Sequence, residues 1–174
     1  MKKCFIILGA ITLVPILSSN YKAMSPNNSL VAFTHTTLKP NTEAQLVLDL
    51  VNQYRTSGCN CGTQYMPPTT VLTYSTLLEK AAQKHSLDMF EHHFFAHIGS
   101  DGSTLENRIN QVNYNYIAAG ENIVYRALNA EHAVKLWINS PGHCKNIMNP
   151  KFNEMGLAFH GNYWTQVLGK AYPY

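Results

Sequence analysis

The chain has 174 residues, of which 45% are hydrophobic and 13% are charged, and this is enough for one domain with a single core. Thirteen lysine and arginine residues against ten acidic residues give a formal net charge of +3. This excess comes from Lys2, Lys3 and Lys22, so the rest of the chain is neutral overall and lacks the positive charge that nucleic-acid binding requires.

Residues 1–23 have the layout of a secretory signal peptide. Lys2 and Lys3 precede an apolar run over residues 5–17, and small residues follow that run. The run is shorter than the ~20 apolar residues that cross a bilayer, although an uncleaved membrane anchor is the alternative. With cleavage after Ala23, we predict a secreted protein, extracellular or periplasmic, that keeps no stable membrane anchor.

Residues 24–40 are polar and predict a flexible arm, and residues 41–174 are expected to form the domain. Apolar residues recur there with helical spacing. Helices are predicted over residues 42–55, from near Ser75 to about 91, from Ser103 to about Val112, and from Asn129 to Ile138. Capping-box pairs stand at the first three starts: Thr42 and Gln45, Thr76 and Glu79, Ser103 and Glu106.

Extended segments alternate with these helices. Residues 119–125 predict a strand, and residues 154–160 and 163–168 flank Gly161-Asn162, which is a hairpin signal. Residues 58–70 predict a loop. Residues 140–143 predict a turn, because proline and glycine both oppose continuation of a helix. The inventory indicates an α+β layered domain in which helices surround a small, mostly antiparallel sheet.

Three cysteines follow the predicted signal peptide: Cys59, Cys61 and Cys144. An exported chain favours disulfides. Cys59 and Cys61 are too close in sequence to pair with each other, so one of the two is expected to pair with Cys144. A zinc site made by all three cysteines is the alternative. It is less favoured, because paired zinc cysteines usually have two or more residues between them.

Four side chains in predicted loops or at element ends could carry chemistry: His97, Glu121, Ser140 and His143. Two imidazoles and a carboxylate could bind a divalent metal, act as general acid and base, or form a polar network that orders loops. Ser140 could be a nucleophile that His143 activates. Because Ser140 does not stand in a Gly-x-Ser-x-Gly elbow, a hydrogen bond to the turn backbone is favoured. His85 lies on a buried helix face and is predicted to be a hydrogen-bonded structural residue.

Several stretches, in the same order along residues 43–170, together resemble the CAP superfamily (cysteine-rich secretory proteins, antigen 5, pathogenesis-related type 1) in its bacterial form. Each stretch alone is a weak signal, and their combination is highly specific. They are Val51–Arg55, His85–Met89, Phe95–His97 before Gly99–Gly102, Gly120–Ile123, Trp137–Cys144, Asn146–Pro150, Glu154–Gly156 and Tyr163–Val167.

The resemblance implies an α-β-α sandwich with a large central cleft. Of the family's two histidines and two glutamates in that cleft, His97, Glu121 and His143 match three, and Ser140 stands where the remaining glutamate would be. The loss of one carboxylate implies a weaker metal site. The resemblance also implies a Cys61–Cys144 disulfide, which leaves Cys59 outside the pair.

Family members bind sterols or fatty acids, bind divalent metals or act in defence or virulence, so the resemblance narrows the fold more than the function. The favoured hypothesis is a secreted, monomeric binding module. Its cleft would hold zinc, another divalent cation or a small ligand through His97, Glu121 and His143, and its surface would bind a lipid or a host or cell-envelope protein. The alternative is an extracellular hydrolase acting on peptide, ester or cell-wall substrates. It would use Ser140 with His143, or a water activated by His97 and Glu121.

Overall fold

The computed structural model describes residues 41–173, so the predicted signal peptide (residues 1–23) and arm (residues 24–40) lie outside the described residues. The helices of the described range are α1 (Thr42–Ser57), α2 (Thr76–Glu91), α3 (Leu105–Gln111), α4 (Ala130–Asn139) and α5 (Pro141–Ile147). Its strands are β1 (Cys59–Cys61), β2 (Gln64–Met66), β3 (Thr73–Tyr74), β4 (Tyr116–Tyr125), β5 (Glu154–His160) and β6 (Tyr163–Ala171). Between residues 41 and 173, none of the helices combines the length and the hydropathy of a bilayer-spanning segment.

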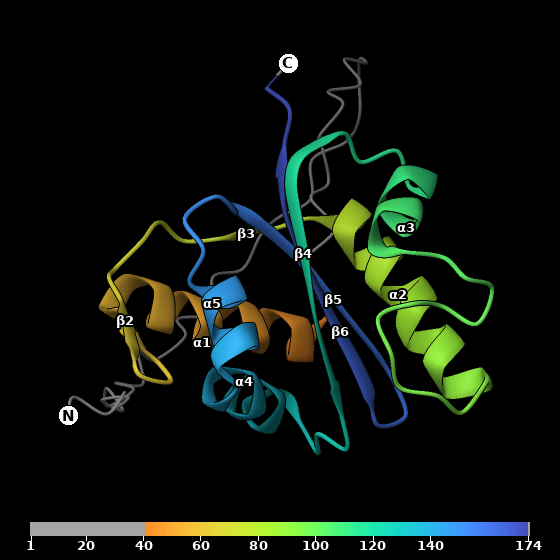
Figure 1. The fold of residues 1–174 in the computed structure, drawn as a ribbon, viewed down its shortest axis with the longest axis horizontal. Helices are drawn as coiled ribbons and strands as arrows, with labels where there is room; N and C mark the ends of the chain where they lie inside the picture. The colour runs from red at the N-terminus through yellow and green to blue at the C-terminus, as the bar shows by residue number, and fades with distance from the viewer. Residues whose placement is uncertain (1–40, 174) are drawn as a thin grey trace, which may run out of the picture.

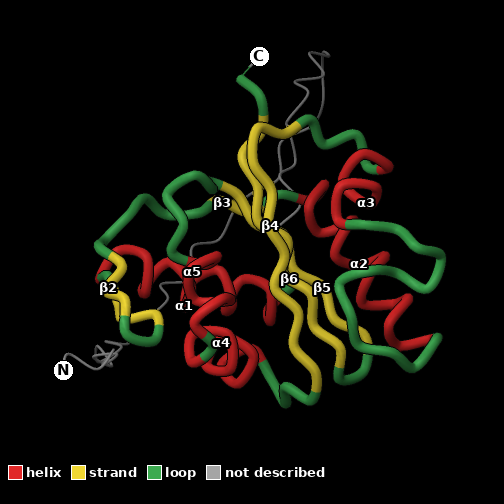
Figure 2. The backbone as a smooth tube through the Cα atoms, in the orientation of Figure 1, coloured by secondary structure: helices red, strands yellow, loops and turns green. Residues whose placement is uncertain are grey.

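A mixed four-stranded sheet in the order β3-β5-β6-β4 forms the middle layer. β4, β5 and β6 pair antiparallel, and the short β3 pairs parallel with β5. Helices α1, α4 and α5 lie on one face of the sheet, and α2 and α3 lie on the other (Figure 1). Figure 2 shows the same strands running between the two groups of helices. The predicted α+β sandwich with a mostly antiparallel sheet is confirmed.

Each face of the sheet packs on its own apolar core. Trp137 and Met155 belong to the core beside α1, α4 and α5, whereas Leu78 and Val167 belong to the core beside α2 and α3. A sheet covered on both faces does not need alternating polar and apolar residues. β6 is accordingly buried without interruption over residues 164–169.

The predicted hairpin around Gly161 is confirmed, because His160 and Tyr163 are paired across the β5–β6 turn. β5 also meets α2 at a close crossing. A Cβ atom on Gly156 would lie 2.0 Å from the backbone nitrogen of Glu79, so a larger residue cannot be placed there without separating the helix from the strand. This crossing sets the position of α2 on the sheet.

Two helix starts differ from the predicted ones by one residue. α1 is capped by Asn41 instead of Thr42, and α3 is capped by Thr104 instead of Ser103, with Asn107 completing the capping box. Neighbouring residues here all carry side-chain oxygens that can cap a helix. The backbone of the capping residue, which is extended at Asn41 and at Thr104, decides which oxygen reaches the helix. The predicted starts near Ser75 and at Asn129 are confirmed, but α2 is capped by Ser75, whose side chain accepts from the Leu78 backbone nitrogen, and not by the predicted pair Thr76 and Glu79.

The prediction of a turn over residues 140–143 is wrong. Pro141 is the first residue of α5, and Ser140 is both the last cap of α4 and the first cap of α5. Proline suits the first helical position, because the N–H that it lacks has no intrahelical partner there and its φ is already helical. His143 therefore lies in the first turn of a helix.

The predicted loop over residues 58–70 contains the antiparallel hairpin of β1 and β2. Its strands are three residues long and show no extended apolar alternation, which explains why the sequence pattern does not reveal them. The turn between the strands contains Gly62 with a φ of +66°, a conformation that favours glycine. Cys59 and Cys61, the two end residues of β1, are both buried.

Candidate functional site

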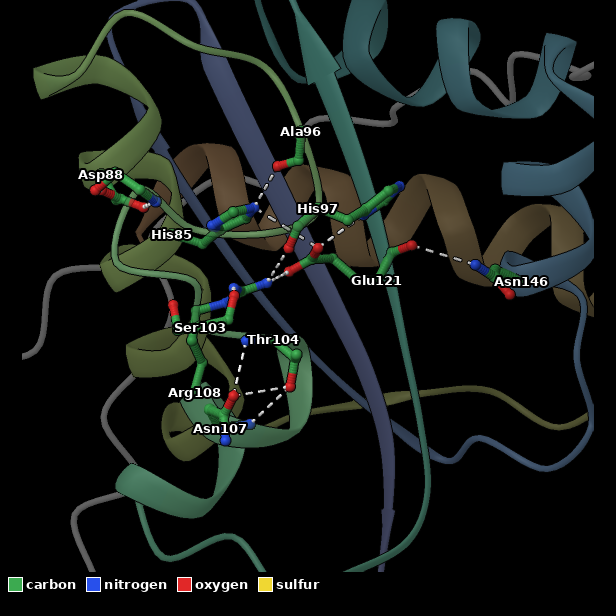
Figure 3. A network of polar contacts seen from close by, with 11 residues as sticks. His85, Asp88, Ala96, His97, Ser103, Thr104, Asn107, Arg108, Glu121 and Asn146 are labelled. Carbon is green, nitrogen blue, oxygen red and sulfur yellow. Dashed lines mark hydrogen bonds and ion pairs between the residues drawn. The ribbon is translucent and has the colours of Figure 1, made fainter.

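The buried carboxylate of Glu121 is the centre of the candidate site. Glu121 lies on β4, and its side chain is only 3% exposed. Because an ionised carboxylate can only accept hydrogen bonds, Nδ1 of His97 donates to Oε1 at 2.8 Å, and the Arg108 guanidinium donates to Oε2 at 2.7 Å. Figure 3 shows the Arg108 guanidinium and the His97 ring next to the carboxylate. With one hydrogen-bond donor on each oxygen, and Nε2 of His85 3.8 Å from Oε1, the carboxylate is held in one orientation.

Arg108 completes this group, and no motif in the sequence points to it. The side chain extends from α3 and is 1% exposed. The guanidinium also donates to the backbone oxygens of Ser103, at 2.9 Å, and His97, at 3.1 Å. Arg108 thus ties the loop that carries His97 to the carboxylate on β4. Arginines are mostly exposed, and the carboxylate partner of Arg108 lies 13 residues further along the chain. No local sequence pattern therefore predicts that Arg108 is buried or that it binds Glu121.

The electrostatic balance keeps Glu121 ionised. Burial by itself raises the pKa of the Glu121 carboxyl. The hydrogen bond from His97 and the positive charge of Arg108 outweigh that effect, and the pKa lies below its ordinary value. At neutral pH the site therefore contains a buried carboxylate anion that is neutralised by a buried guanidinium.

Helix α2 holds the loop in which His97 lies. Nε2 of the fully buried His85 donates to the backbone oxygen of Ala96 at 2.9 Å, next to His97. Asp88, one helical turn further along α2, accepts a hydrogen bond of 2.9 Å from the backbone nitrogen of Ser100. The predicted structural role of His85 is confirmed. The loop is fastened on both sides of His97, whose side chain is nevertheless 56% exposed.

Two asparagines fasten α5 to β4 beside Glu121. Nδ2 of Asn146 donates to the backbone oxygen of Glu121 at 3.3 Å and to Oδ1 of Asn122 at 3.0 Å. Nδ2 of Asn122 in turn donates to the backbone oxygen of His143 at 3.2 Å. Both asparagines belong to the stretches that carry the CAP resemblance. Their structural effect is to hold the first turn of α5 next to the buried carboxylate.

His143 lies near His97 without touching Glu121. Burial lowers the pKa of the His143 ring, and the charge of the nearby His97 lowers it further. Among residues 41–173, no hydrogen bond to the His143 ring is present. Within the same range, the only three cysteine, histidine or acidic residues whose ligand atoms lie within 4.8 Å of one another are Cys59, Cys61 and Cys144. The structure therefore joins His97 to Glu121 directly and places His143 in their neighbourhood.

Ser140 lies at the junction of α4 and α5. Its backbone nitrogen donates to the Trp137 oxygen, but its side chain makes no capping hydrogen bond. In the described part of the chain, its hydroxyl also makes no hydrogen bond to His143. The Ser–His contact that activates a nucleophile is thus not formed in this structure, and neither is the favoured bond to the turn backbone.

The Cys61–Cys144 disulfide that the resemblance implies is present and joins β1 to α5. It connects residues 83 positions apart, with Cα atoms separated by 5.4 Å. The alternative zinc site would need Cys61 and Cys144 as thiolates, so it is not formed in this oxidised state. Because Cys144 follows His143, the disulfide is a further constraint on the first turn of α5.

Acidification is expected to destabilise the fold in two steps. Burial lowers the pKa of His85 and of His143, so between the folded and unfolded pKa values the unfolded state binds more protons. The stabilisation by the neutral rings is therefore lost as the pH falls below ~6.5. The lowered pKa of Glu121 adds a loss below ~4.5. Urea denaturation between about pH 7.5 and pH 4 would measure both steps, and a free energy of unfolding that stays constant down to about pH 5 would contradict the first.

Residues 48–168 match the model of the Cysteine-rich secretory protein family, CAP. The match covers well over half of the chain and includes His97, Glu121, Ser140 and His143. The chain belongs to this family. The CAP domain thus accounts for both helical layers, the sheet and the candidate site.

Two Bacillus subtilis proteins are similar to this CAP domain in sequence. The uncharacterized membrane protein YlbC is 29% identical over 125 residues, which cover 72% of this chain and 34% of YlbC. The uncharacterized protein YkwD is 36% identical over 96 residues, which cover 53% of this chain and 37% of YkwD. The chain thus spans about a third of the length of the curated relatives that it matches.

Solved structures are similar in fold. An extracellular protein of Bacillus anthracis that contains an SCP domain superposes with a TM-score of 0.65 at 26% identity, covering 75% of this chain and 41% of that protein. An outer surface protein of Borrelia burgdorferi has a TM-score of 0.58 at 18% identity, covering 74% of this chain and 89% of that protein. The second similarity shows the fold alone.

Proposed function

We propose that this CAP domain is an exported binding module in which His97 and His143 hold a divalent cation of the zinc class. The observation that carries the proposal is the 2.8 Å hydrogen bond from Nδ1 of His97 to Glu121. Because this bond uses Nδ1, the neutral ring has its lone pair on Nε2, and Figure 3 shows the far edge of the ring turned away from Glu121. Histidines that bind metals commonly donate their other N–H to a carboxylate in this way.

The donor set favours zinc over calcium or magnesium. Imidazole nitrogen is a good ligand for zinc, whereas calcium and magnesium prefer oxygen ligands. The lowered pKa of His143 supports the proposal, because a histidine binds metal in its neutral form. With both Glu121 oxygens held by His97 and Arg108, Glu121 would act behind His97 as its hydrogen-bond acceptor. Ser140 adds no charge, so we expect moderate affinity and room for water or a small ligand on the metal.

Export is part of the same proposal. The basic start and short apolar run of residues 1–23 support it, as does the disulfide, because disulfides persist in oxidising compartments. The similar Bacillus anthracis protein is an extracellular one. We propose binding in preference to hydrolysis, because within residues 41–173 the Ser140 hydroxyl makes no contact of the kind that activates a nucleophile.

Calorimetric titration of the oxidised protein with zinc is expected to show one binding event that depends on both histidines. His97→Ala and His143→Ala each remove one proposed ligand and should abolish the heat of binding or lower the affinity at least ~10-fold. His132→Ala, which removes an imidazole on α4, is the matched control and should leave the affinity unchanged. Zinc binding that survives both site substitutions, or no binding by the unsubstituted protein, would refute the proposal.

A further inference from the structure

Three sulfur atoms meet where the β1–β2 hairpin packs on α5. Alternate residues of a strand point to the same face, so the side chains of Cys59 and Cys61 both point from β1 into the core. Both are buried, as is Cys144. Their Sγ atoms all lie within 4.8 Å of one another. The spacing of one residue, which is unusual for zinc cysteines, is the spacing that places two thiols on one side of a strand.

The Cys59 thiol lies against the disulfide. Its Sγ is 3.8 Å from Sγ of Cys144. Because Cys144 is bonded to Cys61, its sulfur has no hydrogen, and in an S–H···S contact the Cys59 thiol is the donor. A disulfide bond is ~2.0 Å long, so the two sulfurs would have to approach by about 1.8 Å to become bonded. Bond formation therefore requires Sγ of Cys59 to move toward Sγ of Cys144 and into line with the Cys61–Cys144 bond.

We propose that Cys59, Cys61 and Cys144 form an internal thiol–disulfide exchange site. The Cys59 thiolate attacks Sγ of Cys144, the Cys59–Cys144 bond forms, the Cys61–Cys144 bond breaks, and Cys61 leaves as a thiolate. The proton lost by Cys59 is taken up by Cys61 through solvent. One disulfide and one thiol are present before and after the step, so it needs no oxidant or reductant. The reverse step uses Cys61 as the attacking thiolate.

The exchange changes how the hairpin is fastened to the candidate site. In one isomer α5 is tied to the C-terminal end of β1, and in the other it is tied to the N-terminal end. Cys144 follows His143, and a Cβ atom on Gly62 would lie 3.0 Å from the Pro141 ring, so the hairpin already packs against the first turn of α5. Figure 1 shows this hairpin at the edge of the helical layer formed by α1, α4 and α5. The two isomers therefore place different constraints on the turn that holds His143.

The position of the thiol in the folded protein tests the exchange. The full chain with Cys4→Ser, so that only these three cysteines react, is incubated at about pH 7 and about pH 9, because exchange needs a thiolate. It is then quenched in acid, alkylated after unfolding, and sequenced by tandem mass spectrometry to assign the label to Cys59 or to Cys61. We expect label on both residues, with the Cys61 share reaching its equilibrium value faster at the higher pH. Label confined to Cys59 at both pH values would overturn the proposal.

Two substitutions control this measurement. With Cys59→Ser the disulfide has no third thiol, so label on Cys61 should be absent, and any that appears measures incomplete oxidation. With Cys61→Ser the remaining pair should form a Cys59–Cys144 disulfide during oxidation. If Cys59 and Cys144 both stay reduced in that variant while the unsubstituted cluster is oxidised, the proposal fails. If the Cys61→Ser variant does not fold, the distribution of label between Cys59 and Cys61 in the protein with all three cysteines tests the proposal by itself.

Discussion

Glu121→Gln is expected to lower the free energy of unfolding by about 3–5 kcal/mol. The change leaves the Arg108 guanidinium, with a side chain only 1% exposed, without its countercharge. In the unsubstituted protein one Glu121 oxygen accepts from His97 and the other from Arg108. The glutamine amide replaces one of these oxygens with an NH₂ group, which would face a donor. Urea denaturation at about pH 7 measures the loss. Glu131→Gln, on the exposed first turn of α4, is the control and should cost less than ~0.5 kcal/mol.

A double-mutant cycle separates the ion pair from the packing. Glu121→Gln combined with Arg108→Met removes both charges, so it should destabilise the protein by clearly less than the sum of the single changes. The stability and the metal affinity should also respond differently. His97→Ala should remove zinc binding and cost about 1–3 kcal/mol of stability, because it leaves the buried Oε1 of Glu121 without its donor, whereas Glu121→Gln should reduce the zinc affinity and cost more stability. If the loss of unfolding free energy in the double variant equalled the sum of the two single losses, Glu121 and Arg108 would not be a coupled buried pair.

Arg55→Met is expected to destabilise the protein by about 3–5 kcal/mol, because buried acceptors left without donors cost ~1–3 kcal/mol each. Arg55 lies near the end of α1 and is fully buried, and burial lowers its pKa to about 10. Its guanidinium donates to four backbone oxygens, those of Thr70, Ile147, Asn149 and Phe152. One side chain thereby joins α1, the segment before β3, the end of α5 and the segment before β5.

Arg55→Lys tests whether geometry or charge matters at this position. Lysine keeps the positive charge, but a single ammonium group cannot reproduce the planar fork of donors. Most of the loss should therefore remain. Gln53→Met, on the exposed face of the same helix, should change the free energy of unfolding by less than ~0.5 kcal/mol. If Arg55→Lys were as stable as the unsubstituted protein, the planar fork of guanidinium donors would be unimportant for stability.

The helices and the β5–β6 hairpin could be predicted because their signals are local. Apolar residues recur at helical spacing in α1, α2 and α4, and Gly161-Asn162 marks the hairpin turn. The short elements could not be predicted in this way. Pro141 opposes a helix interior and favours a helix start, and only the path of the chain around Ser140 decides between the two. The three-residue strands β1 and β2 are too short for a periodic pattern.

Half of the candidate site could likewise be predicted. His97, Glu121 and His143 stand in recognisable stretches, and the pairing of His97 with Glu121 puts two of them in direct contact. Arg108 could not be predicted, because its partner is brought to it by the packing of α3 against β4. The same holds for the amides of Asn122 and Asn146, whose importance lies in contacts across the sheet edge and not in their own sequence neighbourhood.

The sequence by itself determined the fold class and the family, and it singled out His97, Glu121 and His143 as candidates, because periodicity, turn chemistry and motif order are properties of the linear chain. The tertiary structure alone decided which polar groups are in contact. Glu121 binds Arg108 and His97, Arg55 donates to four distant carbonyls, and Cys59 lies against the Cys61–Cys144 disulfide. These relations depend on distances of a few ångströms between elements far apart in the chain. These distances are set by the packing of the helices on the two faces of the sheet, and they cannot be read from any single segment of the sequence.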